Sequence, residues 1–153
     1  MAKQSFKIEG LSELDAALSE LPKATARNVL LRTLKEQGAP IKDEGERLAP
    51  KLTGGLKESY TVSTKLSRRQ KSQNRKESQV EVYIGPGPSA KSIQTEFGNA
   101  HQAAEPHLRP AFDGNVQRVL NGIKNDLAEQ IEKARARLAK KAERLAAKIA
   151  AGK

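Results

Sequence analysis

The spacing of hydrophobic residues changes from a helical period to a strand-like alternation within residues 49–59. Pro50 has no N–H and disfavours a helical conformation at the residue before it, so the preceding helix is expected to end there. Gly54 and Gly55 permit the positive φ angles that a reversal of the chain requires. The sequence therefore predicts a corner at which a helix turns into a sheet.

A short strand and a short helix are predicted near the N-terminus. Residues 5–8 alternate between apolar and polar side chains, which predicts an edge strand. The segment 14–21 has apolar residues at the i, i+3, i+4 and i+7 positions of an amphipathic helix. Ser12 is the expected N-cap of this helix, with Asp15 three residues later in a variant of the capping box, and Pro22 ends it.

A longer helix is predicted for residues 23–48. Its apolar stripe is formed by Leu30, Leu34, Ile41 and Leu48. Pro40 removes a backbone hydrogen bond and clashes with the preceding turn, so we expect a kink or two abutting helices near Gln37. This feature has two interpretations: a bend that wraps the helix over a sheet, or a functional hinge.

Alternating patterns at 56–66 and 79–84 predict two strands that pair with each other. Between them, residues 67–78 contain no aliphatic or aromatic side chain. Such a segment cannot bury apolar area to offset its ordering entropy, so it is expected to be a long hairpin tip or a mobile loop. The glycines and prolines of 85–88 end the second strand, and the pattern of 89–97 fits either a short helix or a strand.

The longest predicted element is a helix over residues 115–150, on the order of 50 Å long. It follows a polar loop at 99–105 and a proline-stiffened segment at 106–112, and Asp113 is its expected cap. The apolar stripe has an 11-residue repeat, which stays on one side of a nearly straight helix. It consists of Val116, Leu120, Ile123, Leu127, Ile131, Ala134, Leu138, Ala142, Leu145 and Ile149. Because such a helix is longer than this domain can cover, its C-terminal half needs a partner or frays.

The length of 153 residues predicts one domain with a modest core of Leu, Ile, Val and Ala, since the chain has no Trp and only five other aromatic residues. The absence of Cys excludes disulfides and thiolate metal sites. No apolar run approaches the roughly 18 residues of a membrane span, and the N-terminus lacks the apolar core of a signal peptide. We therefore expect a soluble protein that is made in the cytosol and does not contact a membrane.

The net charge of +10 is concentrated in two segments. Residues 65–77 carry a net charge of +5 and residues 131–153 a net charge of +6, which leaves −1 for all other residues. This distribution is typical of electrostatic arms, although a solvated helix face and a solubilising loop would have the same composition. The basic residues of interest are Arg68, Arg69, Lys71, Arg75, Lys76, Lys133, Arg135, Arg137, Lys140, Lys141 and Arg144.

Residue types that carry catalysis are sparse. The only histidines, His101 and His107, lie six residues apart in a loop and between prolines, without the neighbouring ligands of a metal site. The segment 85–88 lacks the Gly-Lys-Ser/Thr sequence of a phosphate-binding loop. Glu96 and Glu105 could form a carboxylate pair, but nothing places an acid, a base and a cleft together. We expect no enzymatic activity and no cofactor.

Three segments together resemble the HK97 gp10-like family of tailed-phage morphogenesis proteins. They are the opening segment at 8–14, then Ala49-Pro50 with Thr53-Gly54, Leu56 and Ser59, and finally Glu96-Phe97-Gly98 followed by Pro106-His107-Leu108-Arg109-Pro110-Ala111. Their order and separation over roughly residues 6–130 match the family better than any one motif does. Asn99 and His107 depart from the family pattern, which usually has Thr and Phe at these positions.

The resemblance implies an α+β fold in which a small antiparallel sheet is flanked by helices, with residues 1–130 as a neck domain and 131–153 as a basic helical extension. It also implies a ring of identical subunits at the phage head–tail junction, between the portal complex and the tail. The implied structural corner comprises Pro50, Thr53, Gly54, Leu56 and Ser59. The implied clamp between the sheet and the last helix comprises Glu96, Phe97, Gly98, Pro106, Leu108, Arg109 and Pro110.

Within this clamp, Arg109 is expected to form a buried or intersubunit ion pair, with Glu96 as a candidate partner. The expected partners of the whole protein are copies of itself and neighbouring neck and tail-terminator proteins in the virion. The alternative function is a DNA-binding accessory protein that uses residues 65–77 and the C-terminal tail. Because aromatic residues are not interleaved with the basic ones, such binding would be nonspecific and salt-sensitive.

Overall fold

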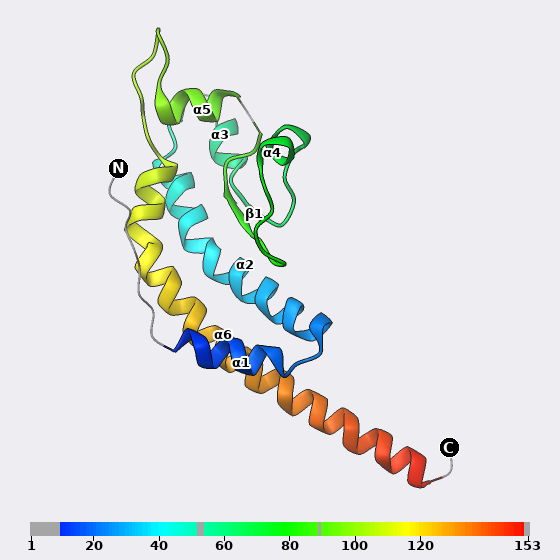
Figure 1. Ribbon diagram of the computed structural model, residues 1–153. Coiled ribbons are helices and arrows are strands. Elements are labelled where there is room, and N and C mark those ends of the chain that lie inside the picture. Colours follow the sequence, from blue (N-terminus) through cyan, green and yellow to red (C-terminus); the bar gives the residue numbers. More distant parts are fainter. Residues whose placement is uncertain (1–9, 52–53, 89, 152–153) are drawn as a thin grey trace.

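The computed structural model describes residues 10–51, 54–88 and 90–151. The predicted edge strand at 5–8 and the motif residue Thr53 lie outside this part of the chain. The described residues form a mixed structure of helices and a two-stranded antiparallel sheet, which confirms the predicted α+β class. In chain order, the elements in Figure 1 are α1 (Leu11–Ser19), α2 (Lys23–Leu48), α3 (Gly55–Glu58), β1 (Thr61–Ser63), α4 (Arg68–Gln73), β2 (Tyr83–Gly85), α5 (Ala90–Phe97) and α6 (Leu108–Ala150).

Helices α2 and α6 form the framework on which the other elements pack (Figure 1). Helix α2 runs without interruption through Pro40, so of the two alternatives, a kink or two abutting helices, the second is wrong. Burial of Ile41 and of the small residues Thr33, Gly38 and Gly45 on the same helix offsets the one backbone hydrogen bond that proline removes. Close approach of α6 is possible because it has Gly122 opposite Gln37, whose amide donates a hydrogen bond to Asp126.

The main hydrophobic cluster lies where α1 crosses α6 beside the N-terminal part of α2. Its buried members are Leu18, Leu21, Val29, Leu127, Ile131 and Ala134. Each fully buried large aliphatic side chain stabilises the fold by about 1.5–3 kcal/mol. The prediction that Ser12 is the N-cap of α1 is wrong. Gly10, with a φ of 85°, takes that position, and the Ser12 hydroxyl donates to Glu13 at 3.1 Å.

The sheet consists of β1 and β2, which pair as predicted with Val62 opposite Ile84. Both strands are shorter than the alternating patterns suggested. The first strand begins late because residues 55–58 form the single turn of α3 instead of extended chain. A two-stranded sheet has little stability of its own and must pack on a helix. It does so at Gly38 of α2, where a Cβ atom would lie 2.9 Å from Cδ1 of Ile84.

Residues 67–78, expected to be a hairpin tip or mobile loop, contain the helix α4. Ser67 caps it through a complete capping box: its hydroxyl accepts from the backbone of Gln70, and the Gln70 side chain accepts from the backbone of Ser67. These local hydrogen bonds stabilise the turn without buried apolar area. Residues 90–97 form helix α5, which decides between the two conformations that their pattern allowed.

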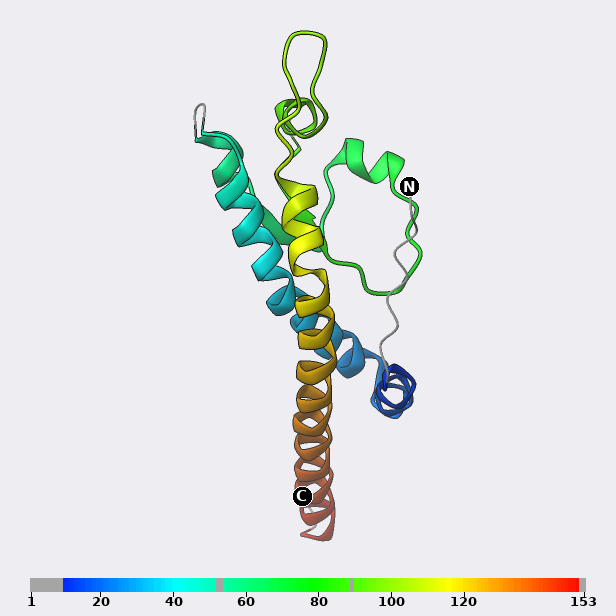
Figure 2. The ribbon, with the colours of Figure 1, turned by 90° about the vertical axis from the view of Figure 1, so that its left-hand side faces the viewer.

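Helix α6 has 43 residues and is roughly 65 Å long. It begins at Leu108 and not near Asn115, and Asp113 lies inside it and does not cap it. Pro110 is tolerated because it stands in the first turn, where backbone N–H groups have no partner within the helix. The side chains of Leu145 and Ile149 are exposed, and the C-terminal part of α6 extends beyond the other helices (Figure 2). No helix among the described residues is long and apolar enough to cross a membrane.

Candidate functional site

Glu96, at the end of α5, accepts hydrogen bonds from the first backbone N–H groups of α6. Its Oε2 accepts from the backbone of His107 at 2.8 Å and of Leu108 at 2.9 Å, and its Oε1 accepts from Arg109 at 3.0 Å. These donors have no partner within α6 itself, and the positive end of the helix dipole favours a carboxylate there. A side chain distant in sequence therefore caps α6 and holds α5 at a defined position on it.

The side chain of Glu96 is 9% exposed. Burial alone raises the pKa of this carboxyl group, but the three backbone donors and the nearby His107 outweigh that effect and place the pKa below its usual value. Glu96 is therefore ionised at neutral pH.

His107 is buried beneath this cap, with 1% of its surface exposed. Burial lowers the pKa of His107, although the charge of Glu96 opposes the shift, so the ring is neutral at pH 7. Its Nδ1 forms a hydrogen bond with the hydroxyl of Tyr60, and the two rings meet edge to face with centroids 5.7 Å apart. The contact of 3.7 Å between Nδ1 and Glu96 is therefore not an ion pair at this pH.

The pKa of Tyr60 decides where the protons lie in the hydrogen bond between Tyr60 and His107. Burial first, and then the charge of Glu96, raise the pKa of Tyr60 far above its usual value, so its hydroxyl keeps its proton and donates it. The acceptor is the unprotonated Nδ1, which assigns the ring proton of His107 to Nε2. That buried Nε2 has no hydrogen-bond partner among the described residues, and a buried donor in this condition costs about 1–3 kcal/mol.

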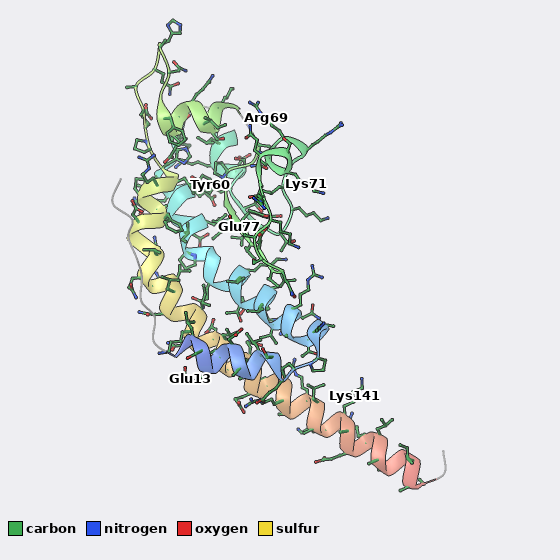
Figure 3. The ribbon with its side chains drawn as sticks, viewed as in Figure 1. Glu13, Tyr60, Arg69, Lys71, Glu77 and Lys141 are labelled. Atoms are coloured by element: carbon green, nitrogen blue, oxygen red, sulfur yellow. The ribbon has the colours of Figure 1, made fainter. Side chains whose placement is uncertain are left out.

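Tyr60 follows the structural corner and packs on α2 at Gly45, where a Cβ atom would lie 2.8 Å from Cζ of the tyrosine. Figure 3 shows Tyr60 where the end of α2 meets the start of α6. The cluster of Tyr60, Glu96 and His107, which we call the junction, therefore connects α2, the corner, α5 and α6.

The corner residues that the structure describes turn the chain as predicted. Gly54 has a φ of 78°, which favours glycine. The hydroxyl of Ser59 donates to the carbonyl of Leu56 at 2.7 Å and accepts from the backbone of Gly87 at 3.2 Å. Ser59 therefore ties the corner to the segment after β2, whereas the half-buried Pro50 stands just beyond the end of α2.

The clamp residues also come together, with one correction. Gly98 has a φ of 75°, and Leu108 contacts the end of β2, lying 3.5 Å from the Cβ position of Gly85. Arg109 is exposed and forms no ion pair with Glu96, because the carboxylate is occupied by backbone donors. Its guanidinium lies 5.5 Å from the ring centroid of Phe97 instead, a cation–π contact. Pro106 and Pro110 flank this turn and are exposed.

Large apolar side chains are exposed beside the junction. Ile93 and Phe97 of α5 and Phe112 of α6 are 59%, 64% and 48% exposed. Phe97 and Phe112 border a hollow of about 450 Å³, together with Ile41, Val82, Ile84 and Leu108. We call Ile93, Phe97 and Phe112 the apolar surface.

The basic residues fall into two groups. Lys133 pairs with Glu129, and Arg135 pairs with both Glu20 at 2.6 Å and Glu132 at 2.9 Å. The other basic residues of interest form no ion pair with a described residue; they are Arg68, Arg69, Lys71, Arg75, Lys76, Arg137, Lys140, Lys141 and Arg144. Most of the cationic surface is therefore open to a partner.

The described residues contain no group of three or more His, Asp or Glu side chains that could hold a metal ion. Comparisons of the chain with family models, with curated proteins and with solved structures found no match. The sequence pattern pointed to Glu96 but not to Tyr60, which belongs to the junction, or to Gly45, on which Tyr60 packs. Two features of the sequence could have identified these residues: a glycine on the buried face of a predicted helix, and a tyrosine just after the corner.

Proposed function

We propose that this protein is a structural component of the tailed-phage head–tail junction, where it forms a ring that joins the portal complex to the tail without catalysis. The proposal depends on one observation: large apolar side chains are exposed in two separate places, one near each end of α6. The apolar surface of Ile93, Phe97 and Phe112 lies near its start, and Leu145 and Ile149 lie near its end. Exposed apolar area of this kind is typical of protein interfaces.

Two different surfaces on one chain favour a head-to-tail contact, in which the end of α6 from one copy covers the apolar surface of the next. Such heterologous contacts form a ring when the rotation closes and a filament when it does not. The resemblance of the corner and clamp motifs to the gp10-like family supports closure into a ring. In this proposal the cluster of Tyr60, Glu96 and His107 sets the angle between α5 and α6. It thereby sets the position of one exposed surface relative to the other.

The oligomer is tested by size-exclusion chromatography with light scattering. We expect the wild-type protein to be larger than a monomer and to form rings in negative-stain electron micrographs. Ile93→Ser/Phe97→Ser and Leu145→Ser/Ile149→Ser should each yield monomers, whereas the control Leu11→Ser removes a side chain that is 43% exposed outside both surfaces and should not.

Mixing the two double variants distinguishes the type of contact. A head-to-tail contact leaves each variant with one intact surface, so the mixture should form a dimer through the remaining pair. An isologous contact made by one surface alone would instead leave the variant of the other surface dimeric before mixing. The place in the virion is tested by detecting the protein in purified particles, and its absence from them would refute the proposed role.

Nonspecific DNA binding is a second candidate function, favoured by the open basic residues of α4 and of the end of α6. Arg68, Arg69 and Lys71 are exposed on a helix that contains no acidic residue. Binding to a DNA duplex should then weaken steeply with salt and disappear when the basic residues at 68–76 are neutralised. Binding that survives both this change and deletion of residues 133–153 would contradict this function.

A further inference from the structure

A groove lies between the N-terminal half of α2 and α6, beside the main hydrophobic cluster. It has a volume of about 320 Å³. Its apolar wall is formed by Val29 of α2 and by Ala134 and Leu138 of α6. Val29 and Ala134 are buried and belong to the hydrophobic core, so this wall is held rigidly.

Three cations line the same groove: Arg32 from α2, and Arg137 and Lys141 from α6. None of them forms an ion pair with a described residue, and no carboxylate lines the groove. Figure 3 shows Lys141 on the portion of α6 that continues past α1. The groove therefore offers positive charge beside an apolar wall, with no negative charge from the described residues.

The adjacent α1 shows what kind of segment this helix accepts. Residues 11–21 contain three acidic residues and no basic one. The buried Leu18 and Leu21 of this segment pack on Leu127 and Ile131 of α6, while Glu20 pairs with Arg135 at 2.6 Å. An acidic amphipathic segment therefore already occupies one side of α6, and the groove presents the same combination of an apolar wall and cations without an occupant from the described residues.

We propose that this groove is a docking site for an acidic amphipathic helix of a partner protein. Carboxylates of the partner pair with Arg32, Arg137 and Lys141, and one aliphatic side chain lies against Val29, Ala134 and Leu138. Arginine favours carboxylates through its planar, bidentate geometry. A DNA backbone would use the cations but has no aliphatic group for the wall. The inference goes beyond the proposed function, because it does not depend on ring formation or on a phage context.

Fluorescence anisotropy with the full chain tests the site. The probe is a labelled peptide of about 18 residues, long enough for partial helicity, with Leu at three- and four-residue spacing and Glu at its exposed positions. Arg32→Gln/Arg137→Gln/Lys141→Gln should weaken its binding at least roughly tenfold, as expected for three charge contacts at a partly exposed site. The matched control Arg118→Gln/Lys140→Gln/Arg144→Gln removes the same charge from exposed positions of α6 outside the groove, and should change the affinity less than about twofold.

Three further measurements use the wild-type protein, so they hold even if a variant folds poorly. A peptide with Ser in place of Leu, and one with Lys in place of Glu, should each bind much more weakly. A DNA duplex should not displace the Glu/Leu peptide at moderate salt. Equal weakening by both triple variants, equal binding of the Ser peptide, displacement by DNA or no binding of the Glu/Leu peptide would each overturn the proposal. A monomeric wild-type protein that still binds the peptide would refute the proposed ring alone.

Discussion

The hydrogen bond between Tyr60 and His107 permits a quantitative test of the junction by a double-mutant cycle. Tyr60→Phe deletes a hydroxyl on a side chain that is 4% exposed and leaves Nδ1 of His107 buried without a donor. An unsatisfied buried group costs about 1–3 kcal/mol, so this variant should lose about that much free energy of unfolding. His107→Phe leaves the hydroxyl of Tyr60 without its acceptor, but it also removes the unpartnered Nε2, so its loss should fall at the lower end of this range.

The double variant Tyr60→Phe/His107→Phe replaces both partners by apolar rings of similar shape. No buried polar group of the pair remains, so its free energy of unfolding should lie within about 1 kcal/mol of the wild-type value. The three backbone hydrogen bonds to Glu96 do not involve either deleted side-chain atom and should persist. The coupling energy of the cycle should therefore be about 1–4 kcal/mol.

Urea unfolding at pH 7.5, followed by circular dichroism, measures these free energies at one protein concentration for all variants. The control Tyr83→Phe removes the half-buried hydroxyl that donates to Glu81 at 2.5 Å outside the junction, and should cost less than about 1 kcal/mol. A double variant as unstable as the sum of the two single variants would refute the inferred pairing of Tyr60 with His107.

The remaining predictions concern the same region. Glu96→Ala should reduce the free energy of unfolding by about 2–3 kcal/mol because three backbone donors of α6 lose their acceptor, whereas Glu96→Gln, which keeps one oxygen acceptor, should cost less in the same urea assay. Gly45→Ala should cost more than about 2 kcal/mol, since the added methyl group collides with the ring of Tyr60, and combining it with Tyr60→Ala should remove that collision. Stability should fall as the pH drops below about 6.5, because the unfolded chain binds a proton at His107 that the folded chain, with its lowered pKa, does not; His107→Phe should abolish this slope. A second loss should begin below about 4.5, where the unfolded chain protonates Glu96 before the folded chain does; Glu96→Gln should reduce this loss, and the carboxyl groups of Glu13, Glu44 and Glu81, whose pKa values are also lowered, account for the remainder. Gly54→Val should impair folding, as judged by its thermal melt, because valine is strained at a φ of 78°.

Local patterns in the sequence determined much of the framework. The bounds of α2 agree with the predicted range of 23–48, and the two alternating segments pair as an antiparallel sheet. The positive φ of Gly54 and the exposed end of α6 also follow from the sequence. These features depend on the period of apolar residues, on the conformations of Pro and Gly and on helix length, all of which act over a few residues.

The tertiary structure alone decided the roles of Glu96, Tyr60 and His107. A carboxylate that caps a helix eleven or more residues away leaves no local signal, because any exposed loop can also contain a glutamate. The same reason explains the start of α6: the cap from α5 satisfies its first N–H groups and allows it to begin at Leu108 instead of near Asn115. The groove at Arg32 and Arg137 likewise exists only because α2 and α6 pack side by side, which brings together cations that are far apart in the sequence.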